Sequence, residues 1–459
     1  MNIWLPTVSL HSLVVVVSIL VYILTTRARR ARRPPSIAIA WVLGMIALPY
    51  LVLPMYLMFG QRKLPRKSSL RAGARTAERH WAKDLIESFG LPAPSPALVT
   101  MHQDGKESAA ALFATMSSAV SRLDICTYIL GDDEFGRETM QRMIERARSG
   151  VEVRLLLDGV GAIQLPKACF GALQRGGVET AIFSPLFARK TQGPRNLRNH
   201  RKMVIADCAR LWAGGRNLAA EYFCGVAGAP PWQDLTFDLQ GPVALAAASQ
   251  FEFDWVSAGG KPASTQIDSA VPVSTGVAGS VLGEAQFLPS GPDQSEDTVH
   301  SLLIDACFHA RERMLAVTPY FVPDVSLETA MRLAARRGVQ IDLCIPSSSN
   351  HRLADFARNR ALRSLSQAGV NVHLLPYMSH AKAVVFDGTL GLAGSVNLDS
   401  RSLLLNYECA VVFYGRGEIN WLANWIEALI PATAPFDCRR PNLVRDLCEG
   451  LLLTVAYQL

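Results

Sequence analysis

Two long stretches without charged side chains open the chain. Asp, Glu, Lys and Arg are absent from residues 1–26 and again from 34–60. Each stretch exceeds the roughly 20 apolar residues that a helix needs to cross a bilayer. The pattern therefore predicts two transmembrane helices, at about 4–26 and 36–59, which form an N-terminal hairpin.

The basic residues beside these stretches do not agree on an orientation. A cleaved signal peptide carries its charge before the apolar run, whereas here five arginines follow it at 27–33, so a hairpin fits better. By the positive-inside rule these arginines favour a cytoplasmic loop. The basic juxtamembrane linker predicted at 61–90 favours the opposite orientation. A hairpin that does not cross the bilayer fully is a further alternative.

From about residue 91 the pattern changes to short apolar runs that alternate with amphipathic segments. Such alternation is typical of α/β units. The order strand, helix, glycine, strand occurs twice, at 121–157 and at 313–345. Both predicted helices stop at a glycine, Gly150 or Gly338, which readily adopts the left-handed conformation of a helix cap. The repetition indicates a duplicated α/β domain.

A polar motif repeats in step with this pattern. The spacing His-x-Lys-x-x-x-x-Asp occurs twice, and in each copy a glycine turn that ends in Asn follows, then an acid seven residues before a glycine. The shared positions are His200, Lys202, Asp207, Asn217 and Asp234 in the first copy and His380, Lys382, Asp387, Asn397 and Glu408 in the second. The acid follows the Asn by 17 residues in the first copy and by 11 in the second.

These repeats set the domain boundaries that we predict. The first α/β domain is expected at 91–260 and the second at 286–459, with a C-terminal helix at its end. The segment 261–285 is rich in Gly, Ser, Ala and Val and is the predicted linker. A repeat of this length indicates a duplicated domain and not a solenoid.

The motif has the residue types that phosphoryl chemistry requires. His-x-Lys on a strand places both side chains on one face, because alternate residues point the same way. Imidazole can act as a nucleophile or proton shuttle, Lys supplies charge for a phosphoryl oxygen, and the Asn amide can donate to it. Ser395, in the second glycine turn, is a further candidate for phosphate binding. Asp234 and Glu408 are candidates to orient the histidines, although an acid at a strand end is as often merely solvated.

Repetition is what makes this signal specific. A single match to the motif is expected by chance in roughly one chain in fifty of this length, and a lone histidine is usually structural. Two matching copies favour one site with two histidines. One histidine would attack phosphorus and form a phosphohistidine, and the other would protonate the leaving alkoxide and then deprotonate the acceptor hydroxyl.

Composition indicates an anionic partner but does not select one. The net charge of +7 at pH 7 suits an anionic partner such as phospholipid head groups or nucleic acid. Nine cysteines lie scattered without a C-x-x-C pair, which argues against a disulfide framework or a zinc site. We expect neither metal nor cofactor, because no carboxylate cluster offers a metal site. The apolar hairpin argues against a nuclease, so phospholipid is the expected partner and nucleic acid is not.

The doubled motif resembles that of the phospholipase D superfamily, and the segments around it are similar to those of bacterial cardiolipin synthases. The similar segments are 41–63, 199–202, 214–222, 231–234, 241–242, 253–255, 289–292, 318–324 and 394–402. The resemblance implies two tandem α/β/α sandwich domains related by pseudo-twofold symmetry. It implies phosphatidyl transfer between two phosphatidylglycerol molecules, giving cardiolipin and glycerol. It also implies a multi-pass protein of the bacterial inner membrane with cytoplasmic catalytic domains.

Two segments depart from that family pattern. The C-terminal segment 443–459 does not read like the usual ending, and its leucines predict a helix that packs on the body or on the membrane. Residues 347–350 lack the expected charged side chains after their strand. The alternatives left open are a phospholipase D or a phosphatidyltransferase with another donor or acceptor. The sequence leaves the attacking histidine and the oligomeric state undetermined.

Overall fold

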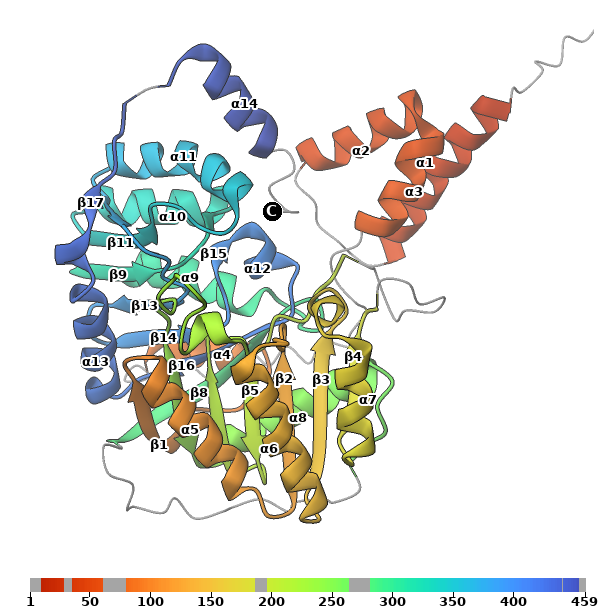
Figure 1. The fold of residues 1–459 in the computed structure, drawn as a ribbon. Coiled ribbons are helices and arrows are strands. Elements are labelled where there is room, and N and C mark those ends of the chain that lie inside the picture. Colours follow the sequence, from red (N-terminus) through yellow and green to blue (C-terminus); the bar gives the residue numbers. More distant parts are fainter. Residues whose placement is uncertain are drawn as a thin grey trace, which may run out of the picture.

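The computed structural model describes residues 10–28, 35–60, 80–185, 196–263, 281–439 and 441–453 (Figure 1). Three apolar helices come first, followed by two α/β halves. The N-terminal helices are α1 (Leu10–Ala28), α2 (Pro35–Ala47) and α3 (Pro49–Phe59).

The second apolar stretch is two helices and not the single helix predicted at 36–59. The break falls at Leu48, whose φ of −138° and ψ of 59° lie outside the helical region. Pro49 causes it, because a proline ring disfavours helical geometry in the preceding residue. No helix among the described residues combines the length and the apolar character that a bilayer crossing requires. Residues 4–9 of the first predicted span lie outside the described ranges.

The described residues of the first half form seven strands and four α-helices. The strands are β1 (Ser95–His102), β2 (Arg122–Thr127), β3 (Glu152–Asp158), β4 (Glu179–Phe183), β5 (Met203–Ala206), β6 (Arg210–Gly214) and β7 (Thr236–Gln240). The helices are α5 (Gly105–Ser118), α6 (Glu134–Arg148), α7 (Lys167–Arg175) and α8 (Pro242–Ser257), with 3-10 helices at Gly161–Gln164 and Ala220–Tyr222.

The second half repeats this order and adds short elements. Its strands are β8 (Val281–Ser290), β9 (Arg313–Val317), β10 (Phe321–Val322), β11 (Gln340–Pro346), β12 (Asn371–Leu375), β13 (Ala383–Phe386), β14 (Leu390–Gly394), β15 (Leu398–Asp399), β16 (Glu408–Phe413) and β17 (Ala434–Pro435). Its helices are α9 (Thr298–His309), α10 (Val325–Arg336), α11 (Arg352–Gln367), α12 (Ser400–Leu404), α13 (Arg416–Glu427) and α14 (Leu443–Leu453), with a 3-10 helix at Ile430–Ala432.

Strand order confirms the predicted duplication. Outward from the centre, the first half runs β1-β7-β6-β5-β2-β3-β4 and the second runs β8-β16-β14-β13-β9-β11-β12, so the strands correspond one by one. Antiparallel pairing of β1 with β8 joins the halves into one 15-stranded sheet, a feature that the sequence did not predict. The two motif histidines lie three residues before corresponding strands, β5 and β13.

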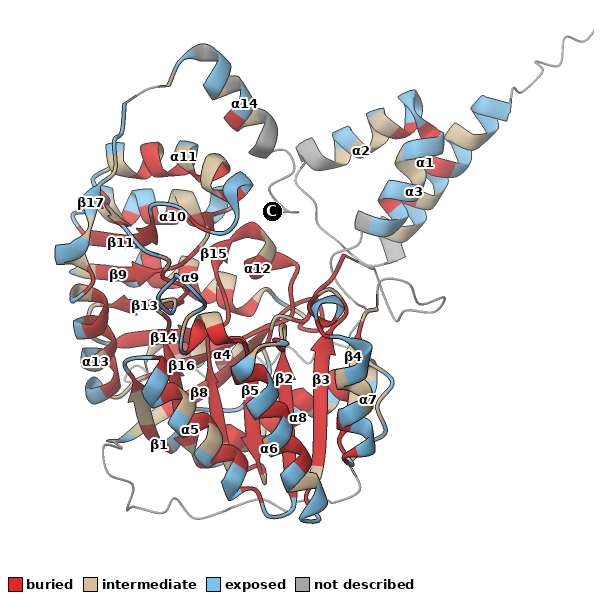
Figure 2. Cartoon of the chain, in the orientation of Figure 1, coloured by how far each residue is buried: buried red, intermediate tan, exposed pale blue. Residues whose placement is uncertain are grey.

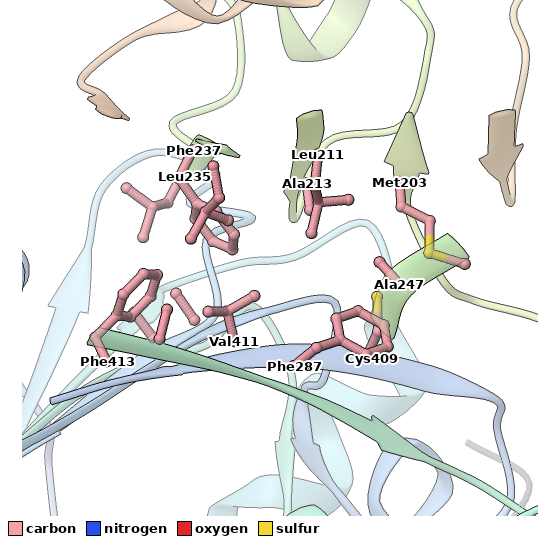
Figure 3. Packing of buried hydrophobic residues seen from close by; sticks show 14 of the residues in the cluster. Met203, Leu211, Ala213, Leu235, Phe237, Ala247, Phe287, Cys409, Val411 and Phe413 are labelled. Atoms are coloured by element: carbon pink, nitrogen blue, oxygen red, sulfur yellow. The ribbon is translucent and has the colours of Figure 1, made fainter. Parts of the chain in front are cut away.

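The largest hydrophobic cluster lies between the halves (Figures 2 and 3). Leu235, directly before β7, and Phe237 of β7 face Val411 and Phe413 of β16 (Figure 3). The two phenylalanine rings meet edge to face with their centroids 5.4 Å apart. Helices α8 and α13 also contribute to this cluster, whereas α5 and α6 cover the other face of the first half. The shared core makes the two halves one packed body.

Two predicted boundaries need correction. The linker 61–90 ends in a helix, α4 (Trp81–Ser88), whose apolar side packs into the core of the second half. The linker 261–285 ends earlier than predicted, because β8 begins at Val281 and its first residues pair with β1. The C-terminal helix α14 packs on α11, where buried Glu449 pairs with Arg363, as expected for packing on the body.

Candidate active site

The two histidines are held by backbone contacts that cross between the halves. The amide of His200 donates to the carbonyl of Tyr407 (2.8 Å), next to Glu408 in the second half. The amide of His380 donates to the carbonyl of Gln233 (2.6 Å), next to Asp234 in the first half. Each histidine is therefore bound by the backbone of the opposite half, at the residue next to that half's acid.

The imidazoles pair with carboxylates in the same crossed manner. His200 Nδ1 lies 2.9 Å from Glu408 Oε1, and His380 Nδ1 lies 2.8 Å from Asp234 Oδ2. Both carboxylates are fully buried. The sequence singled out these two acids but could not show that each serves the histidine of the opposite half. A role for them in catalysis stays a prediction.

The motif lysines lie beside their own histidines. Lys202 Nζ donates to the carbonyl of His200 (2.8 Å), and Lys382 Nζ donates to that of His380. Lys382 Nζ also lies 2.9 Å from Nδ1 of the His380 ring. The structure thus brings His and Lys of each copy together, although by contacts of the loop before β5 or β13 and not by the two-residue period of a strand that the sequence predicted.

The two motif asparagines are buried and donate hydrogen bonds within their own halves. Asn217 Nδ2 donates to the Tyr222 hydroxyl (2.8 Å), and Asn397 Nδ2 donates to the Ser402 hydroxyl (3.1 Å). Neither amide contacts a histidine through a bond that the structure shows. Donation from these amides to a substrate phosphate stays a prediction.

The glycine turns that lead to these asparagines support the acids differently. Ser395 Oγ donates to the Glu408 carboxylate. In the first half Gly215 takes the place of the serine, and a Cβ there would lie 2.2 Å from Asp234 Oδ1. The first turn therefore needs glycine to make room for its acid, whereas the second turn uses a hydroxyl to hold its acid.

The motif aspartates do not belong to this site, which corrects the catalytic role predicted for them. Asp207 accepts from the amides of residues 120, 121 and 122 at 2.7–2.8 Å, and Asp387 accepts from those of 311, 312 and 313 at 2.7–2.9 Å. Each aspartate stands five residues beyond its lysine, at the far end of the strand. At the usual rise of a strand, five residues span about 16 Å. They fix strand ends and the tight turns in which they stand, where φ is 50° and 49°.

Burial sets the charge state of the histidines. Desolvation lowers the pKa of His200 to about 4 and that of His380 to about 3, although Glu408 and Asp234 act in the opposite direction. Burial would raise the pKa of Asp234, but His380 and Lys382 outweigh it, so that pKa lies below its ordinary value. At neutral pH each imidazole is neutral and donates its Nδ1 proton to a carboxylate. Nε2 of each ring then carries the lone pair that can attack, and in the second half Lys382 Nζ lies 3.0 Å from that atom of His380.

Burial also brings the pKa values of the two motif lysines closer to neutral pH. Burial lowers the pKa of Lys202 to about 8 and that of Lys382 to about 7. The acids Glu408 and Asp234 partly oppose that fall. A bound phosphodiester would add negative charge beside both ammonium groups and favour their protonated form.

Sequence reasoning missed the aromatic rings around the histidines. The Tyr128 ring meets that of His200 edge-on at 5.2 Å between centroids, and the rings of Tyr222, Trp232 and Tyr320 lie 5.1, 5.8 and 6.3 Å from that of His380. The sequence could have indicated two of these rings, because Tyr128 and Tyr320 follow corresponding strands of the repeat. Tyr222 and Trp232 have no such counterpart.

Arg201, between the motif His and Lys, was also missed. Its fully buried guanidinium pairs with Asp254 of α8 and with Asp293 of the second half, and it donates to the carbonyl of Glu408 (2.9 Å). The equivalent position in the second copy is Ala381. Repetition could not reveal this residue, because only one copy has it.

A metal site is not evident in the part of the chain that the structure describes. No three His, Cys, Asp or Glu side chains converge there in a way that could hold an ion. The expectation of a reaction without metal or cofactor stays a prediction.

Known proteins share this sequence and fold. A family model described as cardiolipin synthase, PLD-like domain, matches residues 112–226 and 303–430. Cardiolipin synthase A of Pseudomonas aeruginosa PAO1 is 30% identical, with 93% of this chain and 90% of the relative covered. Cardiolipin synthase A of Pseudomonas entomophila L48 is 29% identical, with 89% and 88% covered.

A solved structure supports the two-half architecture. Phosphatidylserine synthase of Haemophilus influenzae Rd KW20 superposes with a TM-score of 0.61 at 14% identity, covering 82% of this chain and 99% of that one. Identity this low shows the fold alone. The sequence matches and the fold together establish that the chain belongs to the cardiolipin synthase family of phospholipase D-like proteins.

Proposed function

We propose that this protein is a phosphatidyltransferase that makes cardiolipin and glycerol from two phosphatidylglycerol molecules. The crossed histidine–carboxylate pairs are the observation that carries the proposal. They provide two neutral imidazoles whose Nδ1 atoms are fixed by Glu408 and Asp234. Two such groups suit a double displacement at phosphorus, in which one attacks and the other transfers protons.

The first step transfers the phosphatidyl group to the enzyme. Nε2 of one histidine attacks the donor phosphorus, and the bond from phosphorus to the head-group glycerol breaks. The phosphodiester's negative charge raises the pKa of the second imidazole, which can then bind a proton and deliver it to the departing alkoxide. The products of this step are a phosphatidyl-histidine and free glycerol.

The second step releases cardiolipin. The second imidazole, now neutral, takes the proton of a head-group hydroxyl on another phosphatidylglycerol. That oxygen attacks the phosphatidyl-histidine, and the phosphorus–nitrogen bond breaks. Lys202 and Lys382 stabilise charge on the non-bridging oxygens throughout, and Asn217 and Asn397 can donate to the same oxygens.

The N-terminal helices are the proposed membrane anchor. Large apolar side chains of α1, α2 and α3 are exposed; examples are Leu10 (70%), Val16 (61%), Ile39 (57%) and Leu51 (59%). Exposed apolar surface of this extent suits a lipid environment. We place the protein in the bacterial inner membrane, multi-pass, with cytoplasmic catalytic domains. A topology reporter fused after residue 459 tests the side, and a periplasmic signal would contradict this placement.

A hydrolase with the same residues is the main competing function, because water can replace the acceptor lipid in the second step. Purified protein is given head-group- and acyl-labelled phosphatidylglycerol in micelles, with chelator and without added metal. The proposal predicts labelled cardiolipin and glycerol. Phosphatidic acid as the only lipid product would show a phospholipase D instead.

A further inference from the structure

An exposed loop near the active site carries no charged, hydroxyl or amide side chain. Residues 224–231 read Cys-Gly-Val-Ala-Gly-Ala-Pro-Pro, and all but Gly225 are exposed. Val226 is 50% exposed. Surface loops normally carry polar side chains, so eight consecutive residues of this kind indicate a surface that faces something other than water.

The loop has a defined shape. The amide of Val226 donates to the carbonyl of Ala229 (3.2 Å), and the amide of Ala229 donates back to Val226 (2.9 Å). Gly225 and Gly228 adopt φ of 83° and 82°, values that glycine reaches without steric cost. Ala227 and Gly228 therefore stand at the tip of the loop, with exposed Val226 beside them.

The base of the loop is tied to the catalytic centre. The Trp232 ring lies 5.8 Å from that of His380, and the next residue, Gln233, accepts the His380 amide. The Gln233 amide in turn donates to the carbonyl of Met378 (3.0 Å), which brings the exposed Tyr377 of the second half alongside. Residues 224–232 and 376–378, whose chains this hydrogen bond joins, are called the apolar rim below.

The second half shows that the loop is not needed to hold the acid. Seventeen residues separate Asn217 from Asp234, but eleven separate Asn397 from Glu408, a difference of six. The shorter connection forms the buried helix α12 and still delivers its carboxylate to a histidine. The additional residues of the first half therefore form an exposed apolar loop that the catalytic geometry does not require.

We propose that the apolar rim inserts into the interfacial layer of a phospholipid bilayer and brings the catalytic histidines to the head groups. This inference rests on the proposed function, since a lipid substrate must reach His380 from a bilayer. An uncharged rim suits acyl chains and glycerol backbones but offers nothing to a polyanion. Trp232 and Tyr377 are the side-chain types that concentrate at membrane–water interfaces.

The test compares two physical forms of one substrate. Full-length protein with Val226→Asp is reconstituted in vesicles of phosphatidylcholine and phosphatidylglycerol, and separately assayed on short-chain phosphatidylglycerol dispersed as monomers. Leu333→Asp is the matched control, because Leu333 is similarly exposed (44%) but lies in the third turn of α10, away from the rim. Folding of both variants is checked by thermal unfolding.

The measured quantity is the ratio of vesicle activity to monomer activity. We expect Val226→Asp to lower it roughly tenfold or more, because an acid enters the bilayer interface unfavourably, and Leu333→Asp to leave it within about twofold. An unchanged ratio for Val226→Asp would overturn the inference, whether both activities stay or both fall together. Failure of the proposed function differs: wild-type protein would then make no cardiolipin from either substrate form.

Discussion

His200 and His380 occupy matching positions in the two halves, but their neighbours differ. Beside His200 the buried Arg201 joins both halves through two carboxylates, whereas beside His380 stands Ala381. His200 has one aromatic neighbour among the ring contacts of the described residues, and His380 has three. What both copies keep is a histidine, a lysine at its carbonyl and an acid from the opposite half.

This difference distinguishes the residues proposed for the reaction, which occur in both halves, from residues with a structural or membrane role, which occur once. The shared groups are those that the proposed displacement at phosphorus uses. Arg201 and the exposed loop at 224–231 occur once, and each can be assigned a task that need be done only once. Arg201 holds the halves together, and the loop is the proposed bilayer contact. The predictions below test this division, from the largest expected effect to the smallest.

Loss of either histidine should have the largest effect on activity. We expect His200→Ala and His380→Ala each to lower transfer by about 10³-fold or more, because attack and proton transfer need both rings. Cardiolipin formation measured with labelled lipid checks this. His309→Ala, a half-exposed histidine outside the site, should stay within about twofold. Substantial transfer by either single variant would mean that one half suffices.

Arg201→Met should have the largest effect on stability. It removes the positive charge that compensates the buried carboxylates of Asp254 and Asp293, so we expect unfolding to become easier by about 3–5 kcal/mol, measured by denaturant titration in detergent. Adding Asp254→Asn and Asp293→Asn to the same chain should restore part of that stability, because the uncompensated charges are gone. If Arg201→Met unfolds like the wild type, the arginine does not hold the halves together.

The two glycine turns should respond unequally to alanine. At Gly215 the added Cβ would displace the Asp234 carboxylate, and with it His380, so we expect a loss of roughly 10–100-fold in kcat. At Ser395 alanine removes a single hydrogen bond to Glu408, and a loss of about two- to tenfold is expected. Steady-state kinetics on both variants checks the order. Equal losses would show that the two acids are held in the same way.

The lysines should set the alkaline limit of activity. Each is active when charged, so kcat/KM should fall as pH rises through about 7 and 8, the pKa values of Lys382 and Lys202. Bound phosphate favours the charged form, so the fall in kcat should come at higher pH than that in kcat/KM. A pH series on wild type and Lys382→Arg measures this. Identical alkaline limits in kcat/KM for the two proteins would exclude Lys382 as the titrating group.

The repeat explains how much of this site could be predicted from sequence. Residues present in both copies, such as His200, Lys202 and Asp234, stood out because two chance matches are improbable. The pairing of each histidine with the acid of the opposite half could not be predicted, because it depends on how β1 and β8 join the halves. Asp207 was misassigned because spacing along a strand does not say which end faces the substrate. Arg201 has no partner in the repeat and left no signal.

The central claim is that both halves form one site, and trapping the covalent intermediate tests it most directly. Labelled phosphatidylglycerol is mixed with wild type, His200→Ala and His380→Ala, the reaction is quenched in alkali, and labelled histidine is located by mass spectrometry. We predict label on one of the two histidines only: it disappears when that residue is replaced and accumulates when the other is replaced. Label on His380 in the His200→Ala protein together with label on His200 in the His380→Ala protein would reveal two independent sites and contradict the account.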